Sequence, residues 1–209
     1  GQPSIISNRD EYIQKKFKNK QYKIFNSSIN SHAAKLLANG GIIARCIGNA
    51  EFGSRALGNR SIIAHPSAKN IKMKINEKVK NRDFWMPFAS TVLEQKAKYY
   101  FKIKGNLNDY QYMTNCVETT DLGREKLAEA IHPYDFTCRP QILLKNVNND
   151  YNDLIERFAK LTNIYGVLNT SLNIHGYPIA GDEKQAINIF LKTDLDGLLI
   201  ENYFIKKIR

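Results

Sequence analysis

The stretch Glu51-Phe-Gly-Ser-Arg-Ala-Leu-Gly-Asn-Arg-Ser61 decides how the rest of the chain is interpreted. It follows the apolar run Gly41-Ile-Ile-Ala-Arg-Cys-Ile-Gly48, which predicts a buried strand. Its two glycines permit positive φ angles and close backbone approach, while Arg55 and Arg60 carry planar guanidinium groups suited to phosphate or carboxylate. The pattern is typical either of an anion pocket at a strand end or of a tight turn with solvated arginines.

Length and composition predict one large domain. A chain of 209 residues with 43% hydrophobic residues is long enough to bury a sizeable core. We find no apolar segment long enough to span a bilayer and no signal-peptide pattern, so we expect no membrane partner and a cytoplasmic location. The cysteines Cys46, Cys116 and Cys138 are widely spaced, which suits a reducing compartment and small buried side chains.

The net charge of +11 permits two interpretations, a nucleic-acid surface or a site for a polyanionic small molecule. Lysines and arginines are spread along the chain, with modest concentrations at residues 15–23 and 72–82. Tyrosines and phenylalanines near the first concentration could stack on bases, but a solvated, partly helical segment also fits. We favour the small-molecule site and keep an RNA-binding module as the alternative.

Hydrophobic periodicity predicts alternating helices and strands that form a mixed α/β sheet. The predicted strands are 41–47, 61–64, 89–93, 110–117, 142–144, 165–168, 197–201 and 203–208. The predicted helices are 33–38, 67–80, 94–101, 122–129 and 151–161, with another starting at Gly181-Asp182. In the last of these, Asp182 and Gln185 have the spacing of a capping box.

Four ordered stretches resemble signatures of the carbamoyltransferase family that includes nodulation, cephem-antibiotic and aminoglycoside O-carbamoyltransferases. Residues 51–62 resemble E-F-G-P-R-A-L-G-N-R-S-I, and residues 76–88 resemble I-N-x-K-I-K-x-R-E-x-F-R-P-F. Residues 135–141 resemble D-G-T-x-R-x-Q, and residues 168–173, followed by Pro178-Ile179, resemble L-N-T-S-F-N with its downstream P-I. Four matches in order are far more specific than any one of them.

The resemblance implies an architecture in which an N-terminal, iron-binding domain of the actin-like ATPase superfamily precedes a domain resembling YrdC, the threonylcarbamoyl-adenylate synthase. This chain corresponds to the second part. Residues 1–28 are then a lead-in that packs on the absent domain, and residues 29–209 are the YrdC-like domain. The implied fold is a mixed, twisted β-sheet flanked by helices.

The resemblance also implies an activity. A YrdC-like domain of this family activates carbamoyl phosphate with ATP to give carbamoyl adenylate, and the N-terminal domain transfers the carbamoyl group to a hydroxyl acceptor. ATP with Mg2+ is then a substrate, and iron is expected only in the absent domain. We predict no metal site in this chain, because its histidines lack H-x-x-x-H and H-E-x-x-H spacing. They are His32, His65, His132 and His175.

A site for carbamoyl phosphate beside a triphosphate needs several converging cations. The resemblance assigns catalytic roles to Arg55, Lys80 and Arg139. The K-x-R and S-x-N pairs of YrdC proteins match Lys80 to Arg82 and Ser171 to Asn173, although a solvated helix end and a local turn also fit these pairs. The full predicted binding set is Arg55, Asn59, Arg60, Ser61, Lys80, Arg82, Arg139, Asn169, Thr170, Ser171 and Asn173.

Five positions depart from the family pattern. Ser54 replaces a proline, Phe136 replaces the glycine of D-G-T, and Trp85-Met86 replaces the usual F-R. Tyr177 stands where a glutamate often precedes Pro-Ile. The missing arginine at Met86 matters most if that position touches ligand, and it then implies altered substrate handling or weakened activity.

Overall fold

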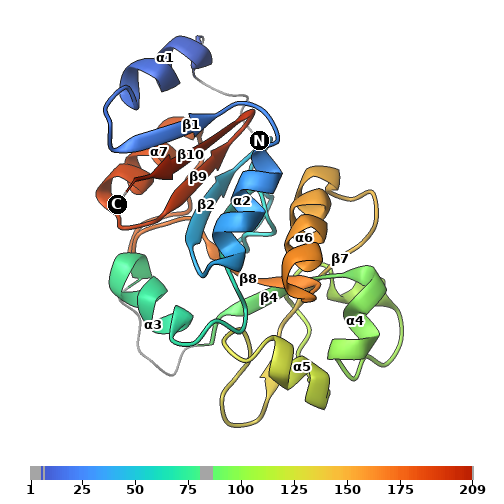
Figure 1. The fold of residues 1–209 in the computed structure, drawn as a ribbon. Helices are drawn as coiled ribbons and strands as arrows, with labels where there is room; N and C mark the ends of the chain where they lie inside the picture. The colour runs from blue at the N-terminus through green and yellow to red at the C-terminus, as the bar shows by residue number, and fades with distance from the viewer. Residues whose placement is uncertain (1–5, 7, 81–86, 209) are drawn as a thin grey trace.

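The computed structural model describes residues 6, 8–80 and 87–208, and in them one eight-stranded sheet organises the chain (Figure 1). The strand order is β1-β10-β9-β2-β3-β8-β4-β7. In that order the bounds are Tyr22–Phe25, Tyr203–Lys207, Gly197–Ile200, Ile42–Cys46, Arg60–Ala64, Gly166–Ser171, Ala89–Leu93 and Gln141–Leu143. A separate short ladder pairs β5 (Val117–Glu118) with β6 (Thr137–Cys138).

The strand directions bring the predicted motifs to one edge of the sheet. Strand β3 pairs antiparallel with both β2 and β8, and β4 pairs antiparallel with β8 and parallel with β7. The carboxyl ends of β2 and β8 therefore meet the amino ends of β3, β4 and β7. We call this the site edge; its register pairs Cys46 with Arg60, Ser171 with Ser61, and Asn169 with Ala89.

Helices cover both faces of the sheet. On one face α2 (Ile29–Ala38) packs against α6 (Asn149–Thr162), and α4 (Glu94–Tyr100) and α5 (Asp121–Lys126) extend that layer (Figure 1). The other face carries α1 (Arg9–Lys16), α3 (Ile71–Ile75), the π-helix Asn76–Lys80 and α7 (Glu183–Lys192).

Strand alternation explains why the sheet can bury both faces. Ile42 and Ala44 of β2 lie in one hydrophobic cluster, whereas Ile43 lies in the other. Successive side chains of a strand point to opposite faces, so an apolar run without polar alternation fits a sheet covered on both sides. The strand predicted at 41–47 and the fold class predicted from the resemblance are both confirmed.

Capping groups fix the ends of the helices that approach the site edge. Asn148 caps α6 by accepting a hydrogen bond from Tyr151 N, and Asp182 caps α7 by accepting one from Gln185 N at 2.8 Å. Gln185 Oε1 in turn accepts a hydrogen bond from Gly181 N at 2.8 Å. The predicted capping relation between Asp182 and Gln185 is therefore confirmed.

One predicted strand was wrong, and one predicted helix was correct only in its second part. The strand predicted at 110–117 is a 3-10 helix over Leu107–Tyr110 (η2), followed by turns and only two residues of β5. Met113 adopts a left-handed φ of 57°, which interrupts any extended run. The helix predicted at 67–80 begins only at Ile71, because Asn70 before it is also left-handed, and its second half is the π-helix.

The described part of residues 1–28 is built into the same domain. Strand β1 pairs antiparallel with β10 at the sheet edge, and Ile13 and Phe17 are buried in the cluster beneath α1. Arg9 forms an ion pair of 2.7 Å with Glu183 of α7. Packing of this segment on a further domain stays a prediction. Among the described residues, no helix combines the length and apolar character needed to cross a bilayer.

Candidate functional site

The loop between β2 and β3 folds around a single carboxylate. Oε1 of Glu51 accepts hydrogen bonds from the backbone N–H groups of Leu57, Asn59 and Arg60 at 2.7, 2.6 and 3.3 Å. Gly58 has a φ of +121°, and a Cβ there would lie 2.4 Å from the Tyr151 ring. We call Glu51 with residues 56–60 the loop base, and residues 52–55 the loop tip.

Arg45 of β2 supports the loop base through hydrogen bonds. The sequence analysis gave this residue no site role. Its side chain is fully buried in β2, and it donates to the Gly58 carbonyl at 2.5 Å and to Asn59 Oδ1 at 3.2 Å. It also pairs with Asp150 of α6 at 2.7 Å, and its guanidinium lies 4.9 Å from the centre of the Tyr151 ring. One charged residue within an apolar strand was the signal that could have identified it.

Arg60 belongs to the loop base and does not reach solvent. It is 3% exposed, and its terminal nitrogens donate to the carbonyls of Ile47, Gly48 and Asn59. Arg60 was predicted to bind phosphate, but in the structure its guanidinium is bonded to backbone carbonyls. Its Nε atom is buried and has no hydrogen-bond partner among the described residues.

Asn59 and Ser61, both predicted binding residues, also stabilise the loop base. Asn59 donates to the Asn49 carbonyl at 2.8 Å, and its side-chain oxygen accepts from Asn148 of α6 at 2.8 Å. Ser61 Oγ accepts a bond from Gly58 N at 3.0 Å. Their side chains thus fix the loop beside the amino end of α6.

The loop tip is open. Residues 52–55 are all exposed, and the Phe52 side chain is fully so. None of the described residues forms a hydrogen bond or ion pair with the Arg55 guanidinium. Arg55 is therefore the cation of this loop that a ligand can reach without breaking bonds of the loop base.

Three predicted residues from distant parts of the chain meet at the carboxyl end of β8. Lys80 Nζ, at the end of the π-helix, donates to Ser171 O at 2.6 Å, Ser171 Oγ at 3.2 Å, Asn173 O at 3.0 Å and Asn173 Oδ1 at 2.5 Å. Ser171 Oγ donates to Asn173 Oδ1 at 2.6 Å. We call these three residues the lysine cluster. Arg82, Trp85 and Met86 lie outside the described residues.

Asn169 and Thr170 lie within β8, although the sequence analysis placed them beyond its end. Asn169 is buried and donates to Thr91 Oγ1 at 2.9 Å and to the Ala56 carbonyl at 3.2 Å. Thr91 donates to Gln141 Oε1 at 2.7 Å, and Gln141 Nε2 donates to the Leu57 carbonyl at 2.8 Å. This buried network joins the loop base to β8, β4 and β7. Thr91 was not predicted as part of the site.

Arg139 lies further along the site edge. It is exposed on the wall of a cavity of about 190 Å³, which Phe88 and His132 also line. His132 Nδ1 lies 3.0 Å from Asp135 Oδ1, and hydrogen bonds from Thr137 lower the pKa of the Asp135 carboxyl. The His132 contact is a local one, in accord with a loop histidine satisfied by its neighbours.

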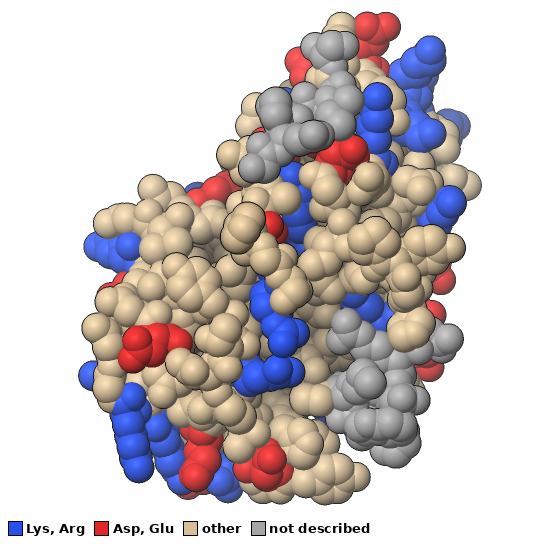
Figure 2. All heavy atoms as spheres, turned by 180° about the vertical axis from the view of Figure 1, so that it is seen from behind, with Lys and Arg blue, Asp and Glu red and all other residues tan. Residues whose placement is uncertain are grey.

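Charge is distributed unevenly over the face that carries α7. Figure 2 shows Lys and Arg atoms following the hollow down the middle of this face, while Asp and Glu atoms lie mainly toward its margins. Such a hollow attracts anions. Within the described residues, no group of three His, Cys, Asp or Glu side chains is placed to hold a metal ion.

Comparison with known sequences places this geometry in context. The family model described as "Carbamoyltransferase C-terminus" matches residues 34–207. Nodulation protein NolNO of Sinorhizobium fredii is 39% identical over 179 residues, covering 86% of this chain and 26% of NolNO. Protein MJ1051 of Methanocaldococcus jannaschii is 39% identical over 210 residues, covering 98% of this chain and 40% of that protein. The chain thus spans only 26% to 40% of the length of these two relatives.

Solved structures share the fold at low sequence identity. Full-length HypF in its phosphate- and nucleotide-bound form aligns with a TM-score of 0.58 at 18% identity, covering 84% of this chain and 25% of HypF. YciO of E. coli aligns with a TM-score of 0.58 at 15% identity, covering 82% of this chain and 76% of YciO. Sua5 of P. abyssi, complexed with L-threonine, aligns with a TM-score of 0.57 at 13% identity, covering 82% and 46%.

Proposed function

The chain belongs to the carbamoyltransferase C-terminal family, and from that membership we propose that it is the carbamoyl-adenylating domain of an ATP-dependent O-carbamoyltransferase. The observation that carries the proposal is the lysine cluster. Lys80 comes from one resembling stretch, and Ser171 and Asn173 come from another, yet the fold joins them by hydrogen bonds of 2.5 to 3.2 Å.

The reaction requires two bond changes. The oxygen of a water molecule bonds to the carbamoyl carbon, and the bond from that carbon to the bridging oxygen breaks. The products are carbamate, which keeps the water oxygen, and inorganic phosphate, and the protons of water pass to phosphate and solvent. An oxygen of carbamate then bonds to the α-phosphorus of ATP, and the α–β phosphoanhydride bond breaks to release pyrophosphate. Negative charge accumulates on the departing pyrophosphate, so fixed cations and hydrogen-bond donors at that point favour the transition state.

The site edge supplies these groups from separate elements. Arg55, on the open loop tip, grips oxygens of carbamoyl phosphate or of the α-phosphate. Lys80 compensates charge as pyrophosphate departs; it is already held by Ser171 and Asn173, so its ammonium needs little reorganisation. Arg139 orients the carbamoyl or phosphate group from the neighbouring cavity. Mg2+ enters with ATP and neutralises part of the triphosphate charge.

Transfer to the acceptor belongs to the remainder of the protein in this proposal. The chain spans 26% to 40% of the length of two relatives. In this proposal, a preceding domain binds iron and the hydroxyl-bearing acceptor. Activation and transfer then separate between domains. The chain alone forms carbamoyl adenylate and does not carbamoylate an alcohol.

Ligand-induced stabilisation tests the polyanion site directly. A ligand that binds only the native state raises its melting temperature by mass action. We expect millimolar ATP with Mg2+, and separately carbamoyl phosphate, to raise the melting temperature of this chain in differential scanning calorimetry. No shift and no heat of binding with either ligand would count against the proposal.

A nucleic-acid-binding module is the second candidate, which the net charge of +11 favours. Binding through scattered phosphate contacts falls steeply with salt and shows no sequence preference. We expect only this behaviour when RNA is titrated between low and physiological salt. Salt-resistant, sequence-selective RNA binding would favour the module over the adenylating domain.

A further inference from the structure

The three backbone carbonyls that follow Arg55 each accept a hydrogen bond from a buried side chain, and each donor comes from a different strand. In the order of residues 56–58, the donors are Asn169 Nδ2 at 3.2 Å, Gln141 Nε2 at 2.8 Å and Arg45 Nη1 at 2.5 Å. The three donor residues are at most 5% exposed. Loss of such a donor is costly, because a buried carbonyl is left without a partner. The backbone directly after the loop tip is therefore held by β8, β7 and β2.

A single hydroxyl sets the orientation of both carboxamides. Thr91 Oγ1 of β4 accepts from Asn169 Nδ2 at 2.9 Å and donates to Gln141 Oε1 at 2.7 Å. Since the oxygen of Gln141 is held by Thr91, its amide nitrogen faces the carbonyl of Leu57. Thr91 is itself fully buried, so water does not compete for these bonds. Thr91 thus links two of the three donors into one unit.

The N–H groups of the same segment are bound by a second set of side chains. Glu51 Oε1 accepts from the N–H of residue 57, and Ser61 Oγ accepts from that of residue 58. Both polar groups of these two peptide units are therefore bonded to side chains. A flexible side chain such as that of Arg55 loses less freedom on binding when its backbone is already fixed, and catalysis depends on such placement.

We propose that Gln141, Thr91 and Asn169 are positioning residues for Arg55. They fix the backbone of residues 56–58 and thereby place the Arg55 guanidinium, without touching the substrate themselves. The inference rests on the proposed function, in which Arg55 grips oxygens of carbamoyl phosphate or of the α-phosphate. Gln141 and Thr91 were outside the predicted binding set, and Asn169 was predicted to bind ligand. In this inference Asn169 acts through the carbonyl of residue 56 instead.

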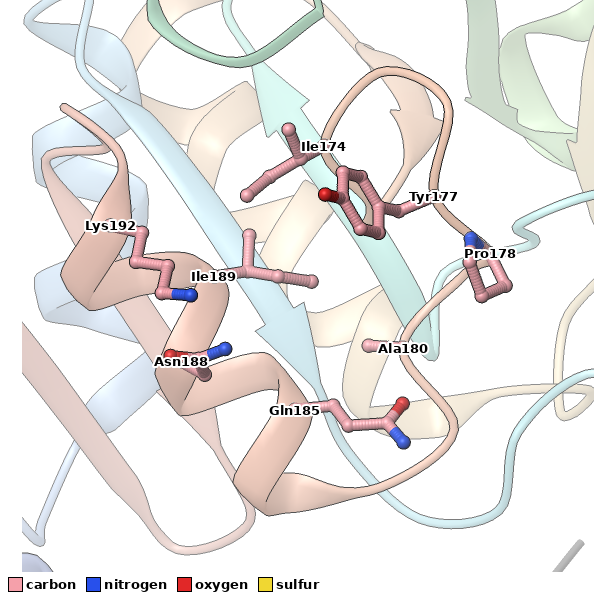
Figure 3. A pocket seen from close by; sticks show the side chains of 8 residues that line it. All are labelled: Ile174, Tyr177, Pro178, Ala180, Gln185, Asn188, Ile189 and Lys192. Atoms are coloured by element: carbon pink, nitrogen blue, oxygen red, sulfur yellow. The ribbon is translucent and has the colours of Figure 1, made fainter.

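The positioning residues lie on the face of the sheet that α2 and α6 cover. Val167, two positions before Asn169 on β8, belongs to the hydrophobic cluster beneath those helices, so Asn169 faces them as well. The other face carries a cavity of about 640 Å³ between α7 and the loop that follows β8, with Ile189 on its wall (Figure 3). Substitutions at Gln141 or Thr91 therefore leave the lining of that cavity unchanged.

Limited digestion with trypsin tests whether these residues hold the loop. Trypsin cleaves after Arg and Lys, and Arg55 is exposed, but a protease requires the residues on both sides of the bond in an extended form. Residues 56–58 must therefore leave their donors before cleavage. We expect Gln141→Leu to speed cleavage after Arg55 by about tenfold, the scale of one buried hydrogen bond. Cleavage after Lys18, at an exposed position of the lead-in, should not change.

Thr91→Val and Ser90→Ala form a matched pair for the same digestion. Thr91→Val keeps the shape of the side chain and removes the hydroxyl that orients both carboxamides, so it should speed cleavage after Arg55 by about fivefold. Ser90, the preceding residue of β4, is also buried but contacts Cys138 Sγ, so Ser90→Ala should match wild type. Thr91→Val supplies every measurement if Gln141→Leu does not fold.

A double-mutant cycle on pyrophosphate release tests whether the positioning residues act through Arg55. The reaction contains ATP, Mg2+ and carbamoyl phosphate. We expect Gln141→Leu to slow release by about tenfold when Arg55 is present, but by less than about twofold in the Arg55→Ala background. A merely structural role would give losses that multiply, because the two substitutions would then act independently.

Faster cleavage after Arg55, together with losses that do not multiply, supports the inference. Unchanged cleavage after Arg55 in both Gln141→Leu and Thr91→Val, or losses that multiply in the cycle, would overturn it while leaving the proposed function intact. Wild-type pyrophosphate release that does not depend on carbamoyl phosphate would overturn the proposed function, and the positioning role with it.

Discussion

The two halves of the loop between β2 and β3 differ in what their side chains do. In the loop base, Glu51 binds three backbone N–H groups, Arg60 binds three carbonyls, and Arg45 supports both from the sheet. In the loop tip, Phe52 and Arg55 are exposed, and Arg55 bonds to none of the described residues.

One motif therefore contains two arginines in opposite environments, one exposed and one buried. Arg55 and Arg60 are five positions apart in the same signature, and both looked suited to phosphate. A buried guanidinium is costly unless it is hydrogen-bonded, and the carbonyls around Arg60 supply that compensation. The loop base is therefore a support built from internal hydrogen bonds, and we expect the exposed tip to be the part that meets ligand.

The largest loss of stability should come from removing the buried guanidinium of Arg45, which supports the loop base. Arg45→Met leaves Asp150 and the Gly58 carbonyl without their buried partner, so we expect the free energy of unfolding to fall by about 3 kcal/mol. Urea denaturation followed by circular dichroism measures it. Arg157→Met, which breaks an exposed ion pair with Asp153 on α6, is the matched control and should cost less than 1 kcal/mol. Equal midpoints for the two variants would contradict a supporting role for Arg45.

The lysine cluster should affect both stability and chemistry. Lys80→Ala removes a preorganised ammonium, so we expect about 2–4 kcal/mol less transition-state stabilisation, measured from the rate of pyrophosphate release. The melting temperature should also fall, because Ser171 and Asn173 lose a common donor. A variant with the wild-type rate would remove Lys80 from the site.

A smaller loss of stability should follow when only the charge of the Glu51 carboxylate is removed. Glu51→Gln keeps an oxygen near the three N–H groups but makes those hydrogen bonds neutral, which weakens them. We expect about 1 kcal/mol lower stability in the same urea experiment. Destabilisation as large as that of Arg45→Met would mean that the carboxylate, and not the buried arginine, is the main support.

Thiol labelling tests, in the unmutated chain, whether the loop base is closed to solvent. Burial raises the pKa of Cys46, next to the loop base, to about 12, and that of Cys138 to about 11, whereas Cys116 is exposed. Because the thiolate is the reactive form, a maleimide or disulfide reagent at pH 8 should modify Cys116 alone in the native chain. Mass spectrometry of peptides checks this. Comparable labelling of Cys46 would show that the loop base opens readily.

Periodicity predicted most of the sheet because each strand is a short apolar run between turn residues, as at β2 and β9. It failed at 110–117, where Tyr110, Tyr112 and Thr114 alternate without a buried face; Tyr112 is 57% exposed. Alternation alone cannot distinguish a strand from a turn that happens to space its aromatic residues.

The sequence likewise predicted some residues of the candidate site and missed others. The resemblance assigned Lys80, Ser171 and Asn173 to one pocket, and the fold does bring them together. The catalytic role of Lys80 and the binding roles of Ser171 and Asn173 stay predictions. No local pattern could pair Arg45 with Asp150, because the two residues are 105 positions apart and meet only when α6 packs on the sheet. Nor does the sequence separate Arg55 from Arg60, since burial decides between them.

Pyrophosphate release from ATP by the Arg55→Ala variant measures whether the open loop tip takes part in the chemistry. We expect wild-type release to depend on carbamoyl phosphate. In Arg55→Ala it should fall by about 2–4 kcal/mol in transition-state stabilisation, with an unchanged melting temperature. Lys18→Ala, at an exposed position in the lead-in, should match wild type. Release by a folded Arg55→Ala variant at the wild-type rate, or release independent of carbamoyl phosphate, would contradict the account.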